Sequence, residues 1–400
     1  MAIRKAGGCL MAGNFERFDP ARVPSPCYVI DLAKLEDNLK LLKSVGERAG
    51  VEILLALKAF SFPGAGGLVG QYLSGTAASG LYEARLGRER FGGAVHTYAP
   101  GLSTANIDGI LEHSDHVILN SLHQWQRFEP QLKAASGVDF GLRINPGHSE
   151  VAQPLYDPCA PWSRLGVPAD AITAEDLAPF GGLHVHALCD HDFDAFDRLL
   201  SAVEERCAHL FGAVRWINLG GGLLITEDGF PIDTLVERLK AFRARTGLKV
   251  YLEPGTAVAL HAGALVAEVL DIAENGAAIG ILDASATCHM PDVIEAPFTP
   301  ELIGAQALPR SLAASEADDL TMRLGGPTCL AGDVIGTYRF ATRPEIGDRL
   351  VFLDLAYYTM VKNTTFNGTP LPSIATWDAR TDAVEIVKTF GYEDFEQRLG

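Results

Sequence analysis

The sequence contains no Cys-x-x-Cys pair, and its seven cysteines are scattered singly along 400 residues. An odd, dispersed set of cysteines argues against the disulfide framework of a small secreted domain. The missing pairs argue against a zinc ribbon. Free thiols of this kind are typical of proteins from a reducing compartment.

Positive charge is also scarce. The chain has 33 Lys and Arg against 50 Asp and Glu, which gives a formal net charge of -17. Nucleic acid and anionic membrane surfaces are therefore poor partners. A cationic substrate such as a polyamine is compatible with this charge, although the solubility of a cytoplasmic protein explains it more simply.

Long hydrophobic runs are absent too. No apolar stretch approaches the ~20 residues of a membrane-spanning helix. The N-terminus has two early basic residues, but GGCLMAG is only weakly apolar and Glu16 follows soon after it. A secretory signal is therefore not predicted, and we expect a cytoplasmic protein with no membrane partner.

Short apolar segments alternate with segments of helical periodicity along most of the chain. Residues 27–31 (CYVID) predict a first strand, and the next strands are predicted at residues 52–57, 75–79, 95–98, 117–119, 139–144, 182–188, 216–219 and 249–252. Roughly eight strand–helix units between residues 50 and 265 predict a closed TIM (β/α)8 barrel of parallel strands. Its active site is expected where the strands end.

Helical periodicity becomes scarce after about residue 265. Strands are predicted at residues 264–274, 278–284, 321–324, 348–356 and 383–389, and residues 306–320 predict an exposed loop. We therefore expect four segments: an N-terminal extension (1–22), a first strand that belongs to the β domain (23–34), the barrel (35–265) and a β-rich C-terminal domain (266–400).

Lys58 lies at the end of the apolar run EILLALKAF. A lysine there projects into the barrel mouth, largely out of water. Desolvation lowers its pKa and frees the amine to form a Schiff base. The alternative is an ordinary lysine at a strand end.

Two other strand ends carry groups that suit a cofactor. Gly220, Gly221 and Gly222 follow the strand WINL, and consecutive glycines let backbone N–H groups converge on an anion. A tight turn is the alternative, and the run contains no GxGxxG motif. Glu253, after the strand VYL, can hold a proton on a ring nitrogen, or it can simply cap a helix.

His184 and His186 alternate along one predicted strand and therefore point the same way. We expect His186 to stack on a cofactor ring and His184 to be hydrogen-bonded packing. Cys189 and Asp190 are near, but their spacing does not support a zinc site, so no metal is predicted. Cys329, on a turn after GGPT, is either a proton donor or a small buried hydrophobic residue.

Taken together and in order, these residues resemble the fold-type III pyridoxal-phosphate (PLP) decarboxylases, the alanine racemase and ornithine/diaminopimelate decarboxylase group. Within it the chain is most similar to the carboxynorspermidine (carboxyspermidine) decarboxylases. The likeness runs from about residue 24 to the end. It rests on the stretches LLALKAF, TAASGLYEARLGRE, DPCAPWSRLGV, NLGGG, YLEPG, ILDASATCHMPD, LGGPTCLAGDVIG, YYTMVKNTTFNG and FGYEDFEQRL.

The resemblance implies an alanine racemase-like fold, with the PLP-binding barrel followed by the β-rich domain, and a role for each cofactor-binding residue. Lys58 would carry PLP, His186 would stack on its ring, and Glu253 would pair with the ring nitrogen. Arg143 would lie near the ring hydroxyl. The phosphate would be held by a strand-end turn and one later residue, namely Gly220, Gly221, Gly222 and Tyr358.

The resemblance also implies a homodimer with active sites shared at the interface. Cys329 and Asp333 would come from the second subunit, with Cys329 protonating the substrate carbon. Asp292 would contact the substrate.

Three positions depart from the pattern of the carboxynorspermidine enzymes. In those enzymes the triple glycine is usually followed by two histidines, and Glu-Pro-Gly by a glutamate that contacts the substrate. Here the residues are Leu223, Leu224 and Thr256. The leucines make the substrate pocket more apolar, and Thr256 removes a charge suited to a distal ammonium.

The predicted function is PLP-dependent decarboxylation of the carboxynorspermidine/carboxyspermidine type, in polyamine and spermidine biosynthesis. The alternative is a decarboxylase of the same fold that acts on another large substrate with a terminal α-amino acid, such as carboxyaminopropylagmatine or a siderophore or secondary-metabolite intermediate. An amino-acid racemase would need a base on each face of the substrate. A non-catalytic regulator or PLP carrier would not need Lys58, Glu253 and Cys329 together.

Overall fold

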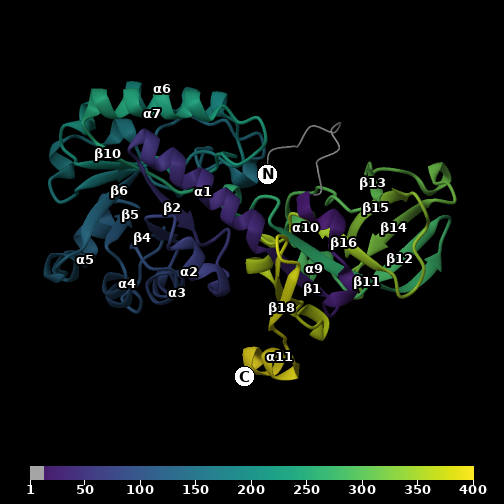
Figure 1. Ribbon diagram of the computed structural model, residues 1–400. Coiled ribbons are helices and arrows are strands. Elements are labelled where there is room, and N and C mark those ends of the chain that lie inside the picture. The colour runs from purple at the N-terminus through teal and green to yellow at the C-terminus, as the bar shows by residue number, and fades with distance from the viewer. Residues whose placement is uncertain (1–12) are drawn as a thin grey trace. The chain divides into compact units, whose positions relative to one another are not determined.

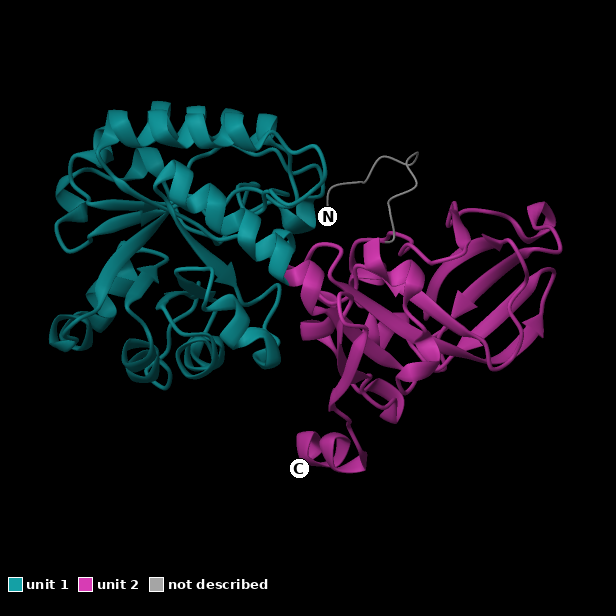
Figure 2. Cartoon of the chain, in the orientation of Figure 1, with its two compact units in different colours: residues 1–4, 36–258 teal, residues 5–35, 259–400 magenta. Residues whose placement is uncertain are grey.

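The computed structural model describes residues 13–400, which form two compact units (Figure 2). One unit comprises residues 36–258, and the other comprises residues 13–35 and 259–400. Residues 1–12 of the predicted N-terminal extension lie outside the described residues. Within residues 13–400, no helix combines the length and the apolar character needed to cross a membrane.

The first unit contains a closed barrel of parallel strands, which confirms the predicted TIM-barrel architecture. β10 pairs with β2 and β5 pairs with β6, so the ring has no open edge. A two-residue strand, β7 (Val167–Pro168), is added beside β6. The barrel strands are β2 (Glu52–Ala56), β3 (Gly75–Ala78), β4 (Ala94–Tyr98), β5 (His116–Leu119), β6 (Asp139–Asn145), β8 (Gly182–His184), β9 (Trp216–Asn218) and β10 (Lys249–Leu252).

Helices surround the ring of strands (Figure 1). In α6, the Asp192 side chain accepts a hydrogen bond from the Ala195 backbone N–H and so caps the first turn. Residues three or four apart, including Phe196, Leu199 and Val203, bury one face of this helix. The helices are α1 (Leu32–Ala49), α2 (Gly66–Val69), α3 (Leu81–Leu86), α4 (Ile107–His113), α5 (Leu122–Ala134), α6 (Phe193–Phe211), α7 (Ile232–Thr246) and α8 (Thr256–Ala259).

The second unit is built on a mixed sheet. β1 (Cys27–Asp31) is its first strand in the sequence but lies between β11 and β17. The later strands are β11 (Gly263–Glu274), β12 (Ala278–Leu282), β13 (Ala305–Leu308), β14 (Thr321–Gly325), β15 (Val334–Phe340), β16 (Arg349–Leu353), β17 (Ser373–Asp378) and β18 (Ala383–Lys388). Its helices are α9 (Ala286–His289), α10 (Asp292–Glu295) and α11 (Tyr392–Leu399).

The predicted exposed loop over residues 306–320 is wrong at its start, because β13 pairs there with β15. β13 lies at the end of the sheet and its middle residues are exposed, so it lacks the apolar alternation of a half-buried strand. The sequence also did not predict β15 or β17. β15 is buried at successive positions, so it too shows little alternation.

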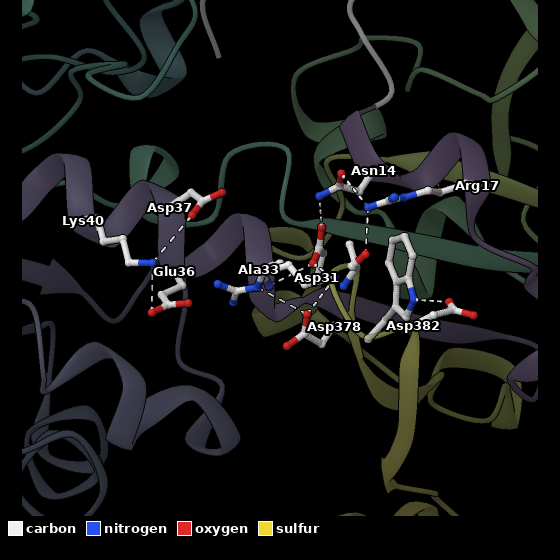
Figure 3. A network of polar contacts seen from close by, with 12 residues as sticks. Asn14, Arg17, Asp31, Ala33, Glu36, Asp37, Lys40, Asp378 and Asp382 are labelled. Atoms are coloured by element: carbon white, nitrogen blue, oxygen red, sulfur yellow. Dashed lines mark hydrogen bonds and ion pairs between the residues drawn. The ribbon is translucent and has the colours of Figure 1, made fainter.

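A buried carboxylate ties the start of the described chain to this sheet (Figure 3). Asp31 accepts hydrogen bonds from Asn14 Nδ2 at 2.7 Å, the Ala33 backbone N–H at 2.9 Å and the Ala379 backbone N–H at 3.3 Å. Because Ala33 lies in the first turn of α1, the same carboxylate caps that helix. Arg17 reinforces the contact by donating to the Ala379 carbonyl at 2.8 Å.

Replacing Asp31 with alanine is expected to lower the free energy of unfolding by about 3 kcal/mol, because buried donors lose their acceptor. Urea denaturation measures this change. Asp37→Ala is the matched control, since the Asp37 side chain is 67% exposed and lies 3.9 Å from Lys40. The control should change stability by less than about 0.5 kcal/mol. Equal losses in the two variants would contradict the role assigned to Asp31.

Candidate active site

The carboxyl ends of four barrel strands carry the predicted site residues. Lys58 lies two residues after β2, His186 lies two residues after β8, and Glu253 follows β10 directly. The glycine turn Gly220–Gly222 comes after β9. Because the ends of parallel strands share one face of a barrel, these groups lie next to one another.

Lys58 and His186 face each other, with Nζ and Nε2 3.3 Å apart. The Gly221 backbone N–H donates to His186 Nδ1 at 3.2 Å, so Nδ1 is an acceptor and the ring proton is assigned to Nε2. Nε2–H can then donate to the lone pair of a neutral lysine amine. Burial, followed by the charge of Lys58, lowers the pKa of His186 to about 3 and keeps the ring uncharged.

Lys58 itself has a lowered pKa. Burial is the largest cause, Glu253 acts against it by attraction, and Arg143 adds to it by repulsion. A lysine with a lowered pKa spends more of its time as a free amine at neutral pH. It is therefore a better nucleophile toward a carbonyl group than an exposed lysine.

Glu253 is a buried carboxylate held between two donors. Asn218 Nδ2 donates to Oε1 at 2.6 Å, and His184 Nε2 lies 3.2 Å from Oε2. Burial alone would raise the pKa of Glu253, but its interactions with His184, and after that with His186, hold it well below its usual range. The carboxylate is therefore ionised and available to hold a cationic ring nitrogen.

The glycine turn approaches the site residues too closely for any larger residue. Gly220 and Gly222 have φ angles of 72° and 88°, in the region that favours glycine. A Cβ on Gly221 would lie 2.0 Å from the Glu253 carbonyl oxygen. The turn is anchored from both sides, because Gly220 N–H donates to Asn218 Oδ1 at 2.9 Å and Glu253 N–H donates to the Gly220 carbonyl at 2.7 Å.

Arg143 and Tyr98 support the histidines. Arg143 donates to the His186 carbonyl at 2.9 Å, and its guanidinium lies over the Tyr98 ring at 4.5 Å. The Tyr98 ring stacks on His184, with centroids 5.4 Å apart. This layer fixes His184 and His186, and it places the predicted Arg143 beside the site.

His184, His186 and Glu253 each offer a ligand atom within 4.8 Å of the others, a spacing that would also suit a metal ion. However, His186 Nδ1 already accepts from Gly221, and Glu253 Oε1 already accepts from Asn218. These hydrogen bonds favour an organic cofactor over a metal.

Asn218 and Tyr98 are site residues that sequence reasoning missed, and His184, expected to be packing, contacts Glu253 directly. Register gives a signal that could have found Asn218. His184 pairs with Arg143 on β6 and with Asn218 on β9, so the three lie in one layer across neighbouring strands. A polar residue inside the apolar run WINL was the visible sign of this layer.

Cys329 and Asp333 lie together on a turn of the second unit. Cys329 is exposed, and its Sγ is 3.1 Å from Asn367 Oδ1. Asp333 is buried and accepts from the hydroxyls of Ser285 at 2.9 Å and Thr328 at 2.7 Å. Its carboxylate therefore holds the turn that presents Cys329.

Asp292 and Tyr358 also belong to the second unit. Asp292 forms an ion pair with Lys362, with Nζ 2.7 Å from Oδ1, and Thr359 lies 3.5 Å from the other oxygen. Tyr358 precedes the short helix η9 (Thr359–Lys362) and has a φ of 49°, which is rare for a side chain of this size.

The three positions that depart from the family pattern lie in the barrel unit. Leu223 is buried and Leu224 is half-buried. Thr256 is buried at the start of α8, and its hydroxyl has no hydrogen-bond partner among residues 13–400. Buried polar groups without a partner are uncommon in proteins.

Comparison with known proteins gives concordant results. A family model described as pyridoxal-dependent decarboxylase, C-terminal sheet domain, matches residues 27–356. A carboxynorspermidine/carboxyspermidine decarboxylase of Campylobacter jejuni is 40% identical over 381 residues, which cover 94% of this chain and 99% of the relative. A carboxyaminopropylagmatine decarboxylase of Synechocystis is 39% identical over 380 residues, which cover 94% and 96%.

A solved structure shows the same likeness in three dimensions. The crystal structure of carboxynorspermidine decarboxylase from Campylobacter jejuni, complexed with norspermidine, matches this fold with a TM-score of 0.86 at 40% sequence identity. The match covers 94% of this chain and 100% of that one. The similarity therefore extends over both units and not only over the barrel.

The lowered pKa of Lys58 predicts early reaction with amine-directed reagents. In protein freed of bound aldehydes, Lys58 should reach half-maximal acetylation at a lower pH than Lys133, whose side chain is 65% exposed. Peptide mass spectrometry across pH 6–11 measures both lysines in one sample. Identical pH profiles would contradict the environment described for Lys58.

Proposed function

The chain belongs to the pyridoxal-dependent decarboxylase family, and on that premise we propose that it uses PLP to remove the α-carboxylate of a carboxylated polyamine. Lys58 is the residue that carries the cofactor. The observation that supports this most directly is the buried amine of Lys58, whose Nζ lies 3.3 Å from His186 Nε2 in a barrel mouth that also contains the Glu253 carboxylate.

The residues in the barrel mouth fit PLP. Lys58 offers an amine to the aldehyde, Glu253 offers a charge to the ring nitrogen, and the glycine turn, where Gly221 has no room for a Cβ beside Glu253, would hold the phosphate. His186 would lie on the ring face and Arg143 near the ring hydroxyl, while Tyr358 would join the turn at the phosphate. When bound, PLP supplies an electron sink for the bonding electrons that CO2 leaves behind.

Each side chain has a separate task in the reaction. Glu253 would keep the ring nitrogen protonated, and Lys58, whose pKa is lowered by burial, would hold the aldehyde before and after the reaction. Loss of CO2 leaves the α-carbon short of one proton, and Cys329 supplies it. The product is an amine with one more hydrogen on that carbon.

Cys329 acts, in this proposal, on the site of a second subunit in a homodimer. Asp333 contributes by holding the turn that carries Cys329. Direct contact of Asp333 or Asp292 with the substrate stays a prediction. A substrate ammonium that reached Asp292 would compete there with Lys362.

The proposed substrate is of the carboxynorspermidine/carboxyspermidine type. Support comes from a relative of that name and from its norspermidine complex. The second candidate is carboxyaminopropylagmatine, or another large substrate with a terminal α-amino acid. It is favoured by a relative of nearly equal identity and by the uncharged Thr256 in place of a carboxylate.

Incubation with PLP followed by borohydride reduction should attach the cofactor to Lys58, as shown by peptide mass spectrometry. Lys58→Arg should lose the label and lower CO2 release by at least about a hundredfold. Lys133→Arg, at an exposed position, should keep both. A label on another lysine in the unmodified protein would refute the assignment of Lys58.

Decarboxylation of a substrate panel should be fastest, by kcat/KM, with carboxynorspermidine or carboxyspermidine. The panel includes carboxyaminopropylagmatine, diaminopimelate, ornithine and lysine, and released CO2 is measured. Thr256→Glu should raise kcat/KM about tenfold for the substrates with a distal ammonium, because one charge-assisted hydrogen bond is added. Thr256→Gln controls for size without charge. Activity confined to carboxyaminopropylagmatine would favour the second candidate.

A further inference from the structure

Asn218 is a fully buried carboxamide that is bonded at both ends. Its Oδ1 accepts from the Gly220 backbone N–H at 2.9 Å, and its Nδ2 donates to Glu253 Oε1 at 2.6 Å. A backbone N–H can only donate, so the orientation of the amide is fixed and a hydrogen must point at Glu253. One planar side chain therefore joins the glycine turn to the buried carboxylate.

His184 gives a second, independent reason to regard Glu253 as a hydrogen-bond acceptor. Its Nε2 lies 3.2 Å from Glu253 Oε2, while its Nδ1 is buried without a hydrogen-bond partner among residues 13–400. A protonated Nδ1 left unpaired in the interior would be costly, so the ring proton belongs on Nε2. Glu253 thus receives one hydrogen on each oxygen and is held as the carboxylate.

We propose that Asn218 is a positioning residue that holds the Gly220–Gly222 turn and the Glu253 carboxylate as one hydrogen-bonded unit. The turn that would bind the cofactor phosphate and the carboxylate that would face its ring nitrogen are then held in position by the same side chain. This inference rests on the proposed function for its meaning. The contacts that carry it are hydrogen bonds within the chain.

Replacement of the carboxamide by a carboxylate tests the donor directly. In Asn218→Asp, two carboxylates face each other in the interior and must share a proton at neutral pH. The folded protein then binds a proton that the unfolded chain releases, so stability falls as pH rises through the neutral range. The other titratable groups that interact with Glu253 are unchanged, namely Lys58, His96, His184 and His186, and so is Arg143, which acts on Lys58 and on both His184 and His186.

The first measurement is thermal unfolding of the full chain without cofactor, from pH 5.5 to 8.5. Relative to the unsubstituted protein, Asn218→Asp should lose about 2 °C in Tm per pH unit. Asn218→Ala removes both hydrogen bonds without adding a charge, so its Tm should be lower by a constant amount. Parallel curves for all three proteins would show that Asn218 acts by packing alone and would overturn the inference.

The second measurement separates the effect of Asn218 on phosphate binding from its effect on ring binding. Dissociation constants are measured for PLP and for pyridoxal, which lacks the phosphate. In Asn218→Ala, pyridoxal should bind about tenfold more weakly because Glu253 loses a donor, and the preference for PLP over pyridoxal should fall about tenfold because the turn is released. A change in only one of these quantities would refute the coupling.

Failure of the proposed function would look different. The unsubstituted protein would then form no adduct with PLP at Lys58, while the pH dependence of Tm would still report on the contact of Asn218 with Glu253. If Asn218→Asp does not fold, Asn218→Ala still decides the inference through the two dissociation constants.

Discussion

The negative charge of Glu253 is the constraint on which the arrangement of the barrel mouth depends. A carboxylate inside a protein is stable only when donors replace the water that it has lost. Asn218 and His184 supply one hydrogen to each oxygen. Satisfying this one group fixes the ring proton of His184 and ties the glycine turn to the end of β10.

The same site contains a carboxylate whose pKa is held low and an amine whose pKa is lowered by burial. Lys58 and Glu253 attract each other, and a direct ion pair would hold the lysine in its unreactive, protonated form. Burial lowers the pKa of Lys58 despite this attraction, and the amine lies against His186 Nε2, while His186 Nδ1 accepts from Gly221. Sites that transfer protons characteristically contain neighbouring groups whose pKa values are shifted from their usual ranges by burial and by one another.

The barrel and the main site residues could be predicted because they depend on local pattern. Short apolar runs gave the strands, and the polar groups at their ends, such as Lys58 and Glu253, gave the position of the site. Asn218 could not be predicted in this way, since its role comes from register with His184 on a neighbouring strand. β15 escaped prediction because burial at successive positions removes the alternation on which a strand prediction depends. The environment of Asp333 could not be predicted either, because its partner Ser285 is distant in the sequence.

The central place of β1 in the sheet of the second unit has a consequence for synthesis of the protein. β1 leaves the ribosome before the whole barrel, yet its neighbours β11 and β17 are made after it. The barrel is contiguous in the sequence and can fold as it emerges, whereas the sheet must wait until nearly the entire polypeptide has been translated. A nascent chain cut short before β17 would leave β1 with a bare edge, which is the kind of surface through which polypeptides aggregate.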